Sequence, residues 1–64
     1  MRVNDEQISL DGTMPVVELL QMKGYPLTRI AVEVNGQIVP KAKYETYELH
    51  DEDTVEIVCF VGGG

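Results

Sequence analysis

Along the chain, apolar and polar residues first alternate with a period of two, then recur at helical spacing, and then alternate again. Residues 1–3 and 7–10 show the first alternation, which predicts two short strands. Asn4 and Asp5 lie between them, and both residue types tolerate the left-handed backbone of a tight turn. The start of the chain is therefore expected to form a hairpin.

Residues 13–24 carry the signals of one helix. Apolar residues recur at helical spacing at four positions: Val16, Val17, Leu19 and Leu20. Thr13 offers a hydroxyl for the N-cap, and Pro15 suits a first turn, where its missing N–H is no loss. Gly24 is typical of a helix end, and Pro26 prevents continuation. A helix of about ten residues is marginal alone, so its apolar stripe is expected to lie on a sheet.

A second hairpin is predicted in the middle of the chain. Residues 29–34 alternate as a strand, and Asn35-Gly36 is the strongest short hairpin signal in the sequence. Residues 37–39 form the expected returning strand, which Pro40 ends or places at a sheet edge.

The last third of the chain predicts a less regular segment and then the longest strand. Residues 41–47 have no clear period and are interpreted as a short helical turn, with Tyr44 or Tyr47 packed inward. Glu48-Leu49 is expected to be a brief strand, and residues 55–61 a long one.

The order of these elements indicates an α+β fold, with one helix lying across a mixed sheet. A chain of 64 residues has room for one small core and not for a deep substrate cavity. Residues 1–61 are therefore expected to form one domain, followed by a flexible glycine tail at residues 62–64. Periodicity leaves the strand order open.

Composition and charge narrow the classes of partner. The chain has five Lys and Arg against eleven Asp and Glu, which gives a net charge of −6. Nucleic acid is therefore not an expected partner, whereas a protein with a basic surface is. The longest apolar run, residues 57–61, is far short of the ~20 residues of a membrane helix. One cysteine allows no internal disulfide, and no charged-then-apolar leader is visible, so a cytoplasmic location is expected.

No set of residues has the spacing of a catalytic or metal site. His50 lies among Asp51, Glu52 and Asp53, without a nucleophile or second His at a suitable spacing. Three consecutive acidic side chains do not converge on a cation as a calcium loop does, so a solvated turn is expected. Cys59 lies in an apolar strand and is interpreted as a core residue in preference to a reactive thiol.

The alternation along the last strand predicts two faces. Two sets of side chains alternate: Val55, Ile57, Cys59 and Val61 on one face, and Glu56, Val58 and Phe60 on the other. If Glu56 marks the solvent side, then Val58 and Phe60 form an apolar docking patch just before the tail. The alternative is that a loop bearing Tyr44 covers Phe60 as a second small core.

The candidate for chemistry is the C-terminus, where Gly62, Gly63 and Gly64 directly follow the last strand. Glycine lacks a Cβ and is costly to order, so such an end is thin and mobile. It suits the threading of a carboxylate into the narrow active-site channel of another protein. A frayed end without function, or a cloning remnant, accounts for three glycines equally well.

Three segments together resemble the thiamin-biosynthesis sulfur-carrier family, ThiS. They read TMPVVELL, AVEVNGQIVPK and DEDTVEIVCFVGGG. The most specific element is the Gly63-Gly64 end, which ubiquitin-like proteins and the small subunit of molybdopterin synthase share. The VNGQIVP hairpin and the short length favour the thiamin branch, whereas the short first hairpin and Pro15 are less typical.

The resemblance implies a β-grasp, ubiquitin-like fold with one helix on a mixed four- to five-stranded sheet. The Gly64 carboxylate would be adenylated by an E1-like adenylyltransferase of the ThiF type, which itself uses ATP and Mg²⁺. A sulfur donor would then give a thiocarboxylate, whose sulfur passes to a thiazole synthase of the ThiG type. Gly62 and Gly63 would thread the end into each partner.

On this reading the chain is a carrier, monomeric when free, that supplies no catalytic group, metal site or stably bound cofactor. Two alternatives stay open from the sequence. One is a molybdopterin-synthase-type sulfur carrier, and the other is a non-covalent ubiquitin-like interaction module.

Overall fold

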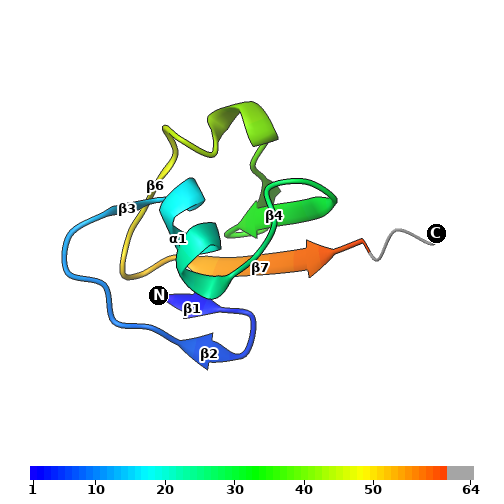
Figure 1. The fold of residues 1–64 in the computed structure, drawn as a ribbon. Helices are drawn as coiled ribbons and strands as arrows, with labels where there is room; N and C mark the ends of the chain where they lie inside the picture. Colours follow the sequence, from blue (N-terminus) through cyan, green and yellow to red (C-terminus); the bar gives the residue numbers. More distant parts are fainter. Residues whose placement is uncertain (61–64) are drawn as a thin grey trace.

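In the computed structural model, which describes residues 1–60, one α-helix lies across one face of a five-stranded mixed sheet (Figure 1). The strand order is β2-β1-β7-β4-β5. These strands are β1 (Arg2–Val3), β2 (Glu6–Gln7), β4 (Ile30–Val34), β5 (Gln37–Ile38) and β7 (Thr54–Cys59). This order places β7, the last strand of the described chain, at the centre of the sheet. Among the described strands of this sheet, β1 and β7 pair in parallel and the other neighbours pair antiparallel. The prediction of an α+β fold with a mixed sheet is confirmed.

A separate two-stranded sheet joins β3 (Met14–Pro15) to β6 (Glu48–Leu49). The short strand at Glu48-Leu49 was predicted, but its partner β3 was not. A two-residue strand carries no readable alternation, and Pro15 in it was interpreted as part of the helix.

Both predicted hairpins form, and each turns at an asparagine in the left-handed conformation. Val3 pairs with Glu6 across Asn4-Asp5, and Val34 pairs with Gln37 across Asn35-Gly36. The φ angles of Asn4 and Asn35 are 53° and 52°, a region that Asn tolerates better than most residues. The returning strands are shorter than predicted, ending at Gln7 and Ile38.

The helix α1 (Val16–Lys23) ends where the sequence predicts but does not begin with the predicted cap. Gly24 closes it with a φ of 79°, as expected for a helix C-terminus. Thr13, however, is not the N-cap: Pro15 occupies that position, and the Thr13 hydroxyl donates to Glu48 Oε1 at 2.6 Å. The prediction of a Thr13 cap was wrong because β3 fixes this segment in an extended form beside β6.

The first turn of α1 is instead satisfied by the backbone of a later segment. The 3₁₀ helix η1 (Lys41–Lys43) leads into a loop that lies against the helix start. The Val17 N–H donates to the Tyr44 carbonyl at 2.8 Å, and the Val16 N–H donates to the Tyr47 carbonyl at 3.0 Å. Two of the N–H groups that a helix start leaves free are thus paired without a side-chain cap.

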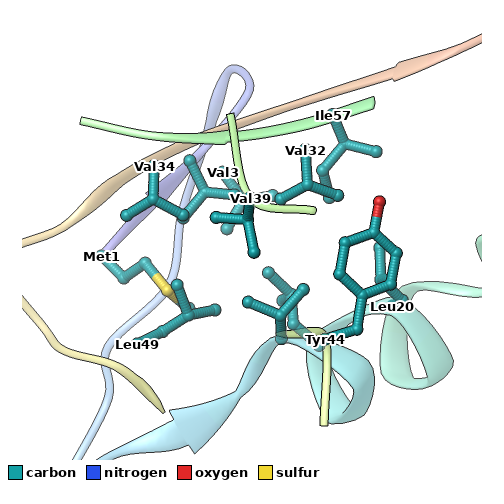
Figure 2. Packing of buried hydrophobic residues seen from close by; sticks show 12 residues of the cluster. Met1, Val3, Leu20, Val32, Val34, Val39, Tyr44, Leu49 and Ile57 are labelled. Carbon is teal, nitrogen blue, oxygen red and sulfur yellow. The ribbon is translucent and has the colours of Figure 1, made fainter. Parts of the chain in front are cut away.

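The core lies between α1 and the sheet face that the helix covers. Figure 2 shows Val32, Val34 and Ile57 on the strand side of the core and Leu20 on the helix side, with Met1 beside Leu49. Tyr44 is buried in this same core, in agreement with the prediction that Tyr44 or Tyr47 packs inward. Burial raises the pKa of the Tyr44 phenol. An eight-residue helix is too short to be stable alone, so burial of side chains such as Leu20, worth about 1.5–3 kcal/mol each, holds it in place.

The acidic turn before β7 is fastened by two carboxylates. Asp51 Oδ1 accepts hydrogen bonds from the Leu10 N–H at 2.8 Å and from the Met1 ammonium at 3.2 Å, and both lower the pKa of Asp51. Asp53 is partly buried, which by itself raises its pKa. Hydrogen bonds from Asn35 Nδ2 (3.0 Å) and the His50 N–H (2.8 Å) outweigh that effect, so the pKa of Asp53 also lies below its usual value.

These two carboxylates should make stability fall as the pH drops below the ordinary Asp value of 3.8. The unfolded chain then binds protons that the folded carboxylates still resist, so the stabilisation present above that pH is lost as the pH falls through the folded pKa values. Urea unfolding of the wild type and of the double variant Asp51→Asn, Asp53→Asn, from about pH 6 to about pH 2, measures this. The difference in unfolding free energy between the two proteins should shrink below about pH 4; a difference independent of pH would contradict the assignment.

Candidate functional site

The sheet face opposite α1 carries an exposed apolar cluster, here called the outer apolar patch. Its exposed members are Ile38 of β5, Val58 of β7 and Phe60, which directly follows β7, and the half-buried Ala31 of β4 lies among them. Val58 and Phe60 are 54% and 57% exposed, and Ile38 is 62% exposed. Ala31 is the register partner of Val58, which places the two side by side on the sheet. An apolar cluster at the end of a central strand is typical of a protein-binding surface.

Phe60 is therefore not covered by a loop. The Tyr44 side chain, which the alternative placed over Phe60, lies in the main core beneath the opposite face of the sheet (Figure 2). Of the two interpretations of the last strand, the exposed patch is correct. The sequence did not predict that Ile38 belongs to this patch. The two-residue turn at Asn35-Gly36 could have indicated it, because this turn sets the register that pairs Ile38 with Glu33.

Two carboxylates stand beside the outer apolar patch. Glu33 of β4 and Glu56 of β7 are direct register partners, and Ile38 is the partner of Glu33 on its other side. Like charges directly opposite each other destabilise a sheet. Among residues 1–60 neither carboxylate has a salt-bridge partner. This face thus combines apolar surface with unneutralised negative charge, which is complementary to an apolar surface flanked by Lys or Arg.

Cys59 is exposed, so its predicted place in the core was wrong. The alternation does assign it to the same face as Val55 and Ile57, both of which are buried. The core that covers that face includes Val55 and Ile57 but not Cys59. Opposite Cys59 on β4 stands Ile30, which is itself only half-buried. Periodicity identified the face but not the length over which it is covered.

The predicted reactive end lies outside the described residues. This applies to Gly64 as the covalent position and to Gly62 and Gly63 as threading residues. The described chain ends at Phe60, whose N–H donates to the Arg29 carbonyl at 2.8 Å. The backbone leading to the glycines is therefore held in the sheet up to Phe60.

In the acidic turn, His50 lies near one carboxylate, that of Asp53. His50 is largely exposed, with Nδ1 3.7 Å from Asp53 Oδ2. In the described part of the chain, no three His, Cys, Asp or Glu side chains are arranged to hold a metal ion. Within the same residues, no helix has the length and hydropathy needed to span a membrane.

A single helix across a mixed sheet, with the last strand at its centre and parallel to the first, defines a β-grasp protein of the ubiquitin-like class. All 64 residues match the sequence profile of the ThiS family. The chain belongs to this family, the sulfur carriers of thiamin biosynthesis. That assignment favours the thiamin branch over the molybdopterin-type carrier.

Individual relatives agree with the family. The crystal structure of the thiamine biosynthesis protein ThiS from Geobacter metallireducens is similar with a TM-score of 0.79, at 30% identity, over 98% of this chain and 96% of that one. The sulfur carrier protein ThiS of Bacillus subtilis is 51% identical over 35 residues, which is 55% of this chain and 53% of that protein. A thiazole synthase of Paramagnetospirillum magneticum is 40% identical over 62 residues, or 97% of this chain. This chain spans only 19% of that enzyme.

The exposure of Cys59 predicts a thiol that reacts in the folded protein. A disulfide reagent should modify it at close to the rate measured in urea, because no packing shields the sulfur. Cys59→Ser should change the free energy of unfolding by less than about 0.5 kcal/mol, as is usual for surface positions. A thiol that reacts only after unfolding, or a serine variant that is strongly destabilised, would show that Cys59 is buried after all.

Proposed function

We propose that this chain carries sulfur as a thiocarboxylate on Gly64 and delivers it for thiazole formation. Membership of the ThiS family is the observation that carries the proposal. The fold is consistent with it, because the central strand β7 leads from the outer apolar patch into the three terminal glycines. The chain acts as a protein co-substrate, and its partners perform the chemistry.

The proposed activation begins at the Gly64 carboxylate, which is a poor electrophile. One of its oxygens attacks the α-phosphorus of ATP, pyrophosphate leaves, and an acyl adenylate forms. Sulfur at the sulfide level, supplied by a donor, then attacks the acyl carbon, and AMP leaves. An E1-like adenylyltransferase of the ThiF type binds the ATP and Mg²⁺, so the carrier needs no cofactor site of its own.

The second proposed partner is a thiazole synthase of the ThiG type, which takes the sulfur. The relative from Paramagnetospirillum magneticum supports this link, because a segment similar to this chain is part of a protein named as a thiazole synthase. We place the reaction in the cytoplasm, since an exposed unpaired thiol such as that of Cys59 is typical of a reducing compartment. The free carrier is proposed to be a monomer.

The outer apolar patch is the proposed docking surface for the adenylating enzyme. Val58 belongs to β7 and Phe60 directly follows it, so an enzyme bound there would contact the chain only a few residues before Gly64 in the sequence. The adjacent carboxylates Glu33 and Glu56 favour a partner that presents an apolar surface flanked by Lys or Arg. Such a partner would neutralise a like-charge pair that the free carrier leaves uncompensated.

Intact-mass measurement tests the carrier function. After incubation with an E1-like enzyme, ATP, Mg²⁺ and a sulfur donor, the chain should gain the mass of one oxygen replaced by sulfur. Deleting Gly64, or adding residues after it, should abolish the gain because the terminal carboxylate is then displaced. An unchanged mass, or a gain that survives both changes, would exclude the carrier function. Supplying thiazole synthase or a molybdopterin precursor then identifies the acceptor.

Phe60→Asp tests the docking surface. The variant should fold normally, since Phe60 lies outside the core, and should lower kcat/KM for adenylation about tenfold or more through loss of an apolar anchor. Met22→Asp is the matched control, because Met22 is also 54% exposed but lies on α1. Equal rates for Phe60→Asp and Met22→Asp would place the docking surface elsewhere.

Raised salt should slow association of the wild type with the enzyme if charge guides the encounter.

A further inference from the structure

Three residues other than glycine adopt a positive φ in residues 1–60, and all three lie beside β7. They are Asn4 (53°), Arg29 (59°) and Asn35 (52°). The two asparagines tolerate this conformation, which their hairpin turns require, whereas at Arg29 it is unfavourable by about 1–2 kcal/mol. All three residues contact the backbone at β7 or just beyond its end.

Each of these residues bonds to the β7 backbone or continues its pairing. Asn35 holds the start: its N–H donates to the Thr54 carbonyl at 2.8 Å, and its Oδ1 accepts from the Thr54 N–H at 3.0 Å. Arg29 accepts a hydrogen bond from the Phe60 N–H, just beyond the other end. Asn4 acts between them, on the edge of β7 that faces β1.

The Asn4 amide acts as an additional rung of the sheet. Its Oδ1 accepts from the Ile57 N–H at 2.8 Å, and its Nδ2 lies 3.3 Å from the Ile57 carbonyl as donor. The same Nδ2 lies 3.2 Å from the Tyr25 hydroxyl, which ties the amide to the segment that follows α1. The β1 backbone has by then turned away, since its last register pair is Val3 with Val55. The Asn4 side chain therefore bonds to the β7 backbone beyond the point where β1 stops pairing with it.

This contact is placed where the strand passes from core to functional end. Val55 and Ile57 are the last buried residues of β7, and Val58 and Phe60 of the outer apolar patch follow at once. Beyond Val55, β4 supports one edge of the strand, and within residues 1–60 the Asn4 amide is the bonded support on the other. Loss of the amide would leave the end of β7 attached along one edge.

We propose that Asn4 is a positioning residue for the reaction at Gly64, acting through the Ile57 backbone. It holds the direction in which β7 leaves the domain, so that an enzyme docked on the outer apolar patch meets the terminal carboxylate in a reactive position. This inference rests on the proposed carrier function. Holding the described end of β7 in place raises the rate in the docked complex, because less freedom is then lost on reaching the reactive geometry.

Asn4→Gly removes the amide while keeping the backbone conformation, because glycine accepts a positive φ. Asn35→Gly is the matched control: Asn35 is the same residue type with almost the same φ, and its side chain bonds to the Thr54 N–H of β7, at the end away from the tail, and to Asp53. Asn4→Asp is the conservative variant, since its carboxylate still accepts from the Ile57 N–H. Hydrogen exchange at Ile57, urea unfolding and adenylation kinetics with the E1-like enzyme are measured on all three and on the wild type.

Asn4→Gly should speed exchange at Ile57 and lower kcat for adenylation about tenfold at saturating carrier. Asn35→Gly, with a similar loss of stability, should stay within about twofold of the wild-type kcat, and Asn4→Asp should recover part of the loss. Measurement at saturating carrier separates a role of Asn4 in stability from a role in positioning. Excess carrier compensates for a smaller folded fraction, but it does not compensate for a strand end held in the wrong direction.

Faster exchange with an unchanged kcat, or equal effects of the two glycine variants, would overturn the positioning role and leave the carrier function standing. A wild-type chain that the enzyme does not adenylate would overturn both.

Discussion

The placement of β7 at the centre of the sheet is the constraint on which the rest of the structure depends. It pairs in parallel with β1 and antiparallel with β4, so the two hairpins are joined only through it. Its inner side chains, Val55 and Ile57, complete the core under α1. Its outer side chains belong to the surface proposed for docking. One strand thus links the stability of the domain to the presentation of its carboxyl end.

The charges on the outer face bear on the choice of partner. Glu33 and Glu56 face each other across β4 and β7, an arrangement that weakens the sheet locally. The same two charges disfavour association with another copy of this acidic face and favour a basic one. In the proposed docking, the two charges that weaken the free sheet would therefore favour a basic partner.

Much of this architecture could be predicted from local signals. Asn35-Gly36 set both a turn and a register, and Gly24 marked the helix end, because each depends on backbone conformations that few residues adopt. Thr13 and Cys59 were assigned wrongly because their surroundings come from distant segments: β6 bonds Thr13, and the core that covers Val55 and Ile57 does not reach Cys59. The role of Asn4 as more than a turn residue was equally invisible, since its partner Ile57 lies 53 positions away. Periodicity reports which face a residue occupies, and only the assembled fold reports how far that face is covered.

The parallel pairing of β1 with β7 also has a consequence for biosynthesis. Residues 2 and 3 pair with residues 54 and 55, so the sheet can close only after the chain has been synthesised through β7. A translation product that stops before β7 has two disconnected hairpins and an open core, and such a species is a substrate for proteases rather than a domain. The segment that carries the reactive glycines follows immediately after the strand that permits folding. A chain cut before β7 therefore lacks both the closed sheet and Val58 and Phe60, the residues proposed for docking.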